Sequence, residues 1–209
     1  MITSIQNEIE STYRISCPFS VEEFLLDESH RKSYLTRFPW LAHSQEVLLV
    51  EQEGHDLHVG LFLDSKLLDW SRNKKWNGGD GADLDKMGPL IEGVSHFVYL
   101  TWRAEQDRPV TQLELELQGE VDKFVLFSRE HSPEKSAQLF ERLFHKVSWL
   151  QGLKPDEKFR YETAIQLASR YCHFLKSRFF LPSRPEALFP EIRSFYRMSQ
   201  SEKIRHIQH

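Results

Sequence analysis

Between residues 88 and 207 the chain repeats one pattern, a helix-starting signal followed by apolar residues at helical spacing. A proline opens most of these segments, where its missing N–H costs a helix nothing. The helices predicted in this way cover residues 89–106, 109–127, 133–150, 155–180, 186–197 and 200–207. The last of them follows the capping box Ser199-Gln200-Ser201-Glu202. Such a succession predicts a multi-helix array.

A β-hairpin is predicted closer to the N-terminus. Residues 46–52 (EVLLVEQ) and 57–63 (LHVGLFL) have the composition of strands and are joined by a short polar turn. Apolar residues alternate along the second strand, so that one of its faces can be buried. A lone hairpin is marginally stable in water. A third strand, for which residues 12–16 are the candidate, or a covering helix must therefore complete it. Short helices are expected at 20–26 and 31–38.

The predicted fold is α+β and predominantly α-helical, with a small N-terminal antiparallel β-hairpin packed on a multi-helix array. We expect a single domain over residues 1–209. It would combine a mixed α/β segment, 1–71, with a mainly helical part, 82–209, through a soft joint at 72–81 that is rich in glycine and cations. The predicted core consists of Val59, Leu61, Leu63, Val94, Phe97, Val98, Leu113, Leu117, Phe124, Phe140, Phe144, Val147, Ala168, Leu175 and Phe179.

Composition excludes several classes of protein. Aromatic residues make up 12% of the chain, which argues against disorder. No apolar run reaches the length of a membrane span, and residues 1–11 lack the apolar core of a signal peptide. The two cysteines are far apart and form no CxxC motif, which favours a reducing compartment, so we expect a cytoplasmic protein. Gly-rich nucleotide loops, a GxSxG elbow and an HExxH zinc motif are all missing from the sequence.

The first candidate site is a row on the helix predicted at 89–106. If this segment is helical, the spacing places Glu92, His96, Tyr99 and Arg103 on one line, opposite an apolar stripe. Such a row could supply a general base, an orienting carboxylate and a cation for an anionic substrate. The simpler interpretation is that this row is the solvated side of an amphipathic helix. Residues 94–102 (VSHFVYLTW) could instead form a buried strand, which would separate Glu92 from Arg103.

The second candidate is Glu120, near the centre of the apolar stripe of the helix predicted at 109–127, with Glu116 at its edge. A buried carboxylate must be paired, protonated or metal-bound, because burying a bare charge is costly. Arg103 or His96 of the preceding helix could be that partner. The alternatives are a structural salt bridge between the helices and a Glu120 side chain that reaches the edge of the stripe.

A divalent metal could bind to these residues but is not the favoured interpretation, and no ligand set or cofactor is assigned. Glu92 and His96, four residues apart, could share one ion. Glu141 and His145 repeat that spacing, which differs from the Glu-x-x-His of carboxylate-bridged di-metal bundles. Asp83 and Asp85 fail as a calcium loop, because position 12 is Val94 instead of Glu, so Asp83 is predicted to cap a helix.

Charge is unevenly distributed along the chain. From residue 151 onward eleven Lys and Arg face six Asp and Glu, whereas sixteen face twenty-five in the first 150 residues. Basic and aromatic residues near the C-terminus, including Arg193, Arg197 and Lys203, could hold nucleic acid. The overall pI of about 6.2 argues against it, so nucleic acid is not the expected partner.

Three functions remain open. The first is a soluble cytoplasmic interaction or accessory protein, acting through a protein partner or as a homo-oligomer, without catalysis. The second is a small enzyme or ligand-binding protein, with or without a metal ion, built on Glu92, His96, Tyr99, Arg103, Glu116 and Glu120. The third is nucleic-acid binding through the basic C-terminal part. A pocket in which the Glu92 row faces Glu120 would favour the second.

Overall fold

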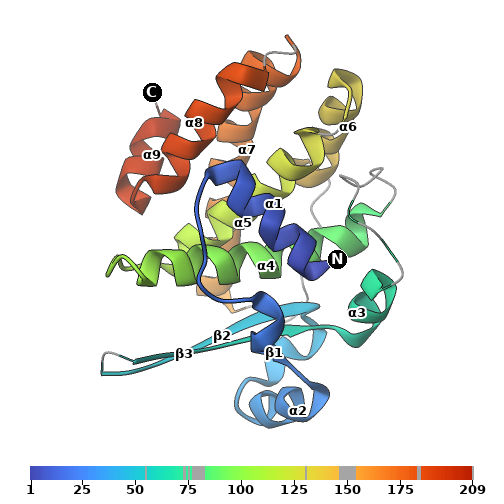
Figure 1. Cartoon of the computed structure of the whole chain (residues 1–209), viewed down its shortest axis with the longest axis vertical. Helices are drawn as coiled ribbons and strands as arrows, with labels where there is room; N and C mark the ends of the chain where they lie inside the picture. The colour runs from blue at the N-terminus through green and yellow to red at the C-terminus, as the bar shows by residue number, and fades with distance from the viewer. Residues whose placement is uncertain are drawn as a thin grey trace.

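The computed structural model describes residues 1–54, 56–72, 74, 76, 83–129, 131–145, 154–182 and 185–208. Within them the fold is α+β and predominantly helical, as predicted (Figure 1). The α-helices are α1 (Ile2–Tyr13), α2 (Glu28–Arg37), α3 (Ser65–Arg72), α4 (Leu84–Ala104), α5 (Gln112–Arg129), α6 (Pro133–Phe144), α7 (Pro155–Leu175), α8 (Pro185–Arg197) and α9 (Gln200–Gln208). Shorter turns are 3₁₀-helical at Val21–Phe24 and Pro39–His43, and π-helical at Lys176–Phe180.

The sheet has three strands, in the order β1 (Leu25–Leu26), β3 (Asp56–Leu63), β2 (Glu46–Glu53). β2 and β3 form the predicted antiparallel pair, whereas β1 runs parallel to β3. The alternation along β3 separates two apolar clusters, because successive side chains point to opposite faces. Leu61 and Leu63 join the main core, and Phe62 packs with Tyr34 of α2 on the other face.

The N-terminal segment differs from the prediction. Residues 12–16 do not form the third strand, because residues 2–13 are helix α1. Its buried positions include Ile2, Ile5 and Ile9, at the spacing of one helical face. The strand that completes the sheet is the dipeptide Leu25–Leu26, which was expected to be helical.

The central helix is α4, and its contacts reverse one expectation. Residues 94–102 are helical, but the helix begins at Leu84, five residues before Pro89. The side expected to face solvent is largely covered, since His96, Tyr99 and Arg103 are all buried. α4 contacts β2 and β3 on one side and α1 and α5 on others, so it has no broad solvated face (Figure 1).

Other predicted boundaries shift by a few residues. The helix expected from Pro109 begins at Gln112, and Asp83 stands at the N-cap of α4 without a side-chain hydrogen bond. Most of the predicted core is buried, but Leu113 and Val59 are half-buried. Val147 and much of the joint at 72–81 lie outside the described residues.

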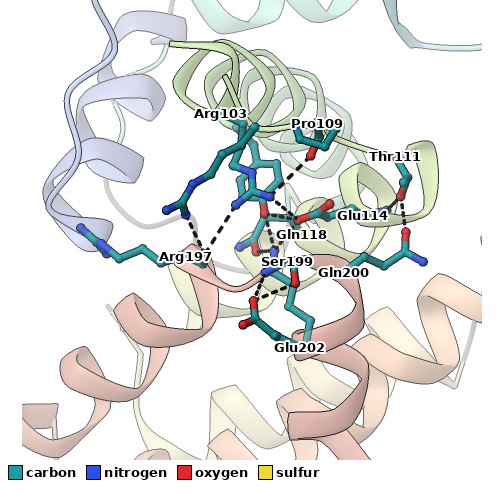
Figure 2. A network of polar contacts seen from close by, with 12 residues as sticks. Arg103, Pro109, Thr111, Glu114, Gln118, Arg197, Ser199, Gln200 and Glu202 are labelled. Carbon is teal, nitrogen blue, oxygen red and sulfur yellow. Dashed lines mark hydrogen bonds and ion pairs between the residues drawn. The ribbon is translucent and has the colours of Figure 1, made fainter. Parts of the chain in front are cut away.

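A buried polar network joins α9 to α4 and α5 (Figure 2). Lys203 is fully buried, and its ammonium donates hydrogen bonds to Tyr99 Oη and Gln118 Oε1, both at 2.8 Å. Tyr99 in turn donates to Glu114 at 2.6 Å, and Gln118 to Asp122 at 2.7 Å. Burial lowers the pKa of Lys203 to about 7 and raises that of Asp122 to about 6.

The same network ties in more distant segments. Asp122 also accepts hydrogen bonds from Ser95 and from Tyr13 of α1, both at 2.5 Å. The Arg103 guanidinium lies 3.7 Å from Glu114 Oε1. Lys203 and Arg103 therefore face Glu114 and Asp122 inside the core. Partners of this kind allow polar and charged groups to be buried at a tolerable cost.

We expect Lys203→Met to destabilise the protein by about 3 kcal/mol, because Asp122 and Glu114 would stay buried without their cation. Urea unfolding measures the change. Arg205→Met, on the exposed side of the same helix, is the matched control and should leave stability nearly unchanged. Equal free energies of unfolding for the two variants would contradict this role of Lys203.

Candidate functional site

A second group of charged side chains is gathered between the sheet and helices α4 and α5. The antiparallel packing of the two helices brings one pair of side chains from α4 against several from α5, beside the first residue of β2. The group consists of Glu46, Glu92, His96, Glu116, Glu120 and Lys123.

Two glycines allow these elements to approach so closely. A Cβ at Gly119 of α5 would lie 3.0 Å from His96 Nε2, so a larger residue would push the imidazole ring aside. A Cβ at Gly93 of α4 would lie 3.0 Å from Leu63 Cδ2 and 3.5 Å from Glu46 Cβ. The helix therefore packs tightly on the sheet and places Glu46 beside His96.

The centre of the group is formed by Glu92, His96 and Glu116. One potential ligand atom from each lies within 4.8 Å of the other two. His96 is only 5% exposed, with Nδ1 3.7 Å from Glu46 Oε2 and Nε2 3.8 Å from Glu116 Oε2. Among the described residues, neither His96 Nε2 nor Glu46 Oε2 has a hydrogen-bond partner. Unpaired buried polar atoms are rare. Here His96 Nε2 lies beside the Glu116 carboxylate, and Glu46 Oε2 lies beside the other ring nitrogen, Nδ1.

Glu120 finds its partner on its own helix. Lys123 Nζ lies 2.8 Å from Glu120 Oε1 and 2.9 Å from Glu92 Oε2. Neither candidate partner, Arg103 or His96, pairs with Glu120, and Lys123 instead forms a salt bridge between the helices through Glu92. Burial raises the pKa of Glu120, and the nearby Lys123 offsets this only in part. For Glu92 the attraction of Lys123 and His96 outweighs burial and lowers the pKa.

Proton binding is strongly perturbed at Glu116 and His96. Burial raises the pKa of Glu116 to about 8, despite the nearby His96. Burial alone would lower the pKa of His96, but Glu46 and Glu116 overcome it and raise the value to about 9. Both groups are thus protonated at neutral pH in the ion-free protein, and the excess of carboxylates is compensated by protons.

The site opens into a hollow of about 1240 Å³ that all six side chains line. Arg160 and Tyr161 of α7 line it as well. Arg160 Nε lies 3.8 Å from Glu116 Oε1 and, within the described part of the chain, donates no hydrogen bond. The group is thus reachable from outside, unlike the network around Lys203.

Of the six residues predicted from the sequence, the structure brings four together, namely Glu92, His96, Glu116 and Glu120. Tyr99 and Arg103 belong instead to the Lys203 network, because they lie further along α4 and meet a different part of α5. Sequence reasoning missed Glu46, Lys123 and Arg160. Lys123, three residues after Glu120, carried a signal in its spacing.

The other sequence candidates do not add to this site. Glu141 and His145 form an exposed pair at 2.8 Å. Near the C-terminus, Arg193 and Arg197 donate to the last carbonyls of α1, those of Thr12 and Tyr13, at 2.8 and 3.0 Å. These cations stabilise a helix C-terminus.

Comparison with protein-family models, curated proteins and solved structures gives no significant match to the chain. A functional conclusion therefore rests on the geometry and chemistry of the site. No helix among the described residues is long and apolar enough to cross a membrane.

We expect the stability of the EDTA-treated protein to fall as the pH rises from about 6.5 to 8. Glu116 and His96 bind protons more tightly in the folded state than in the unfolded state. Their contribution to the free energy of unfolding is therefore present at low pH and is lost as the pH rises through their folded-state pKa values of about 8 and 9. Urea unfolding at several pH values measures this. Glu116→Gln should flatten the dependence. A wild-type stability that is constant over this interval would contradict the assignment.

Proposed function

We propose that the protein binds one divalent metal ion through Glu92, His96 and Glu116, as the centre of a metal-dependent ligand-binding site or enzyme. The observation that carries this proposal is the unpaired Nε2 of His96, which is buried beside two carboxylates. An imidazole nitrogen and two carboxylates are a common ligand set for transition metals.

The distances suit an ion after a small contraction. Ligand atoms bound at about 2.1 Å lie roughly 3.0–4.2 Å from one another around a metal. The three candidate atoms are already within 4.8 Å. Glu46, on the opposite side of the imidazole, would accept the Nδ1–H and hold the tautomer that leaves Nε2 free. A carboxylate behind a metal-bound histidine is the usual second partner of such sites.

The charges support the same conclusion. The site holds the carboxylates of Glu46, Glu92, Glu116 and Glu120 against the cations of Lys123 and Arg160. With neutral His96 as a ligand, a deficit of two positive charges remains, which one divalent ion compensates. In its absence Glu116 and His96 take up protons instead.

The position of Lys123 favours one ion over two. Its ammonium lies between Glu92 and Glu120, where the second ion of a di-metal carboxylate site would be expected. The nitrogen ligand favours zinc, manganese, iron or cobalt over calcium, which prefers oxygen alone.

Three protein ligands leave coordination positions for water or a substrate, which is typical of catalytic metal sites. A bound ion could polarise a carbonyl or lower the pKa of water in the hollow. This supports the enzyme or ligand-binding hypothesis. An accessory role through a protein partner or homo-oligomer, and a cytoplasmic location, stay predictions from the sequence.

We expect one equivalent of transition metal per chain after the purified protein is incubated with Zn²⁺ or Mn²⁺ and desalted, as measured by mass spectrometry. His96→Ala and Glu116→Gln should lose the ion, and Glu46→Gln should weaken binding by about 10–100-fold. His145→Ala is the matched control, because His145 has the same spacing from a glutamate but is exposed. A wild type without metal, or equal metal in His96→Ala, would rule out the site.

Metal affinity should rise as the pH increases from 6 to 9. The ion must displace protons from Glu116 and His96, whose pKa values are about 8 and 9, so binding is weakest where both are protonated. Isothermal titration in buffers of different ionisation enthalpy gives both the affinity and the protons released. Binding that releases no proton at pH 7 would contradict this coupling.

A further inference from the structure

The hollow beside the proposed metal site is lined by charged and apolar side chains. Its charged lining includes the carboxylates, His96, Lys123 and Arg160. Half-buried apolar residues follow on the same elements, with Leu48 of β2 two residues from Glu46 and Leu100 of α4 four residues from His96. Other half-buried apolar residues of the lining are Val59 of β3, Val110, Leu115 of α5 and Ile165 of α7, and further parts of the lining are polar. Apolar residues next to a few convergent polar groups are typical of ligand sites.

Arg160 supplies a recognition group beside the carboxylates. Its buried Nε lacks a hydrogen-bond partner among the described residues and lies 3.8 Å from Glu116 Oε1. A guanidinium presents N–H groups in a planar fork that matches the two oxygens of a carboxylate. An acid bound to the ion could therefore be contacted by Arg160 as well.

The charge of the site limits the ligand. With one divalent ion, the four carboxylates and the two cations are in balance, so the site offers no excess positive charge for a phosphate dianion. A single negative charge can be accommodated by direct coordination to the ion and by Arg160. The half-buried apolar residues of the lining favour a ligand whose remaining part is hydrocarbon.

We propose that the hollow binds a monocarboxylate with an apolar chain, its carboxylate on the metal ion and Arg160 and its chain along the wall that includes Val59 and Val110. This inference rests on the proposed metal site, because the ion provides the main contact to the carboxylate. It identifies the class of substrate or ligand as an aliphatic organic acid.

The test titrates the metal-loaded full-length protein with acetate, butanoate, hexanoate and octanoate by calorimetry. Each added methylene that enters the hollow should strengthen binding about three- to fourfold. Arg160→Gln should weaken the binding of all four acids by a similar factor and leave the gain per methylene unchanged.

Val59→Thr places a hydroxyl on the apolar wall with little change in shape, so it should reduce the gain per methylene. Leu57→Thr is the matched control, because Leu57 lies on the same face of β3 but does not line the hollow. Val110→Thr provides a second test of the wall on a different segment. Unfolding curves of each variant show that the fold is retained.

The outcomes separate the two proposals. The protein could bind metal while its affinity for acids does not depend on chain length, or is changed by neither Arg160→Gln nor Val59→Thr. Either result overturns the proposed ligand and leaves the metal site in place. If the affinity for acids depends on chain length but no metal is bound, the metal site is overturned. A ligand site made of the apolar residues and Arg160 then remains. Binding of neither metal nor acid overturns both.

Discussion

The close packing of α4 against α5 is the contact on which the rest of the structure depends. Gly119 lets the two helices meet at His96, and Gly93 lets α4 settle on the sheet. Because α4 is covered on several sides, polar residues along it are buried and must find partners within the fold. Two charged clusters are the result, and their α5 residues lie on opposite faces of that helix.

The two clusters satisfy their charges differently. Around Lys203, hydrogen bonds connect Tyr99, Gln118 and Asp122 into a buried network that attaches α9 and α1 to the core. Around His96, carboxylates outnumber cations, and an imidazole nitrogen is left unpaired beside a solvent-accessible hollow. A buried hydrogen-bonded network stabilises a fold, whereas an accessible group with an excess of one charge indicates a binding site.

Much of the secondary structure and part of the site were predictable from local patterns. Helical spacing placed Glu92 and His96 on one face of a helix, and the apolar surroundings of Glu120 indicated that this carboxylate needs a partner. The same reasoning missed α1, although its buried isoleucines recur at helical spacing. It also assigned Tyr99 and Arg103 to the site, because a straight row on a helix does not show which part of the neighbouring helix each residue will meet.

The positions of most helices, the β2–β3 pair and the class of fold can be read from the sequence, since they follow from short-range periodicity and from helix-starting signals. Three features of the site cannot be read from it. They are the position of Glu46 behind His96, the pairing of Lys123 with Glu120 and the presence of Arg160 in the same hollow. A local pattern sets only the direction of a side chain on its own element. The convergence of several elements depends on how the whole core packs.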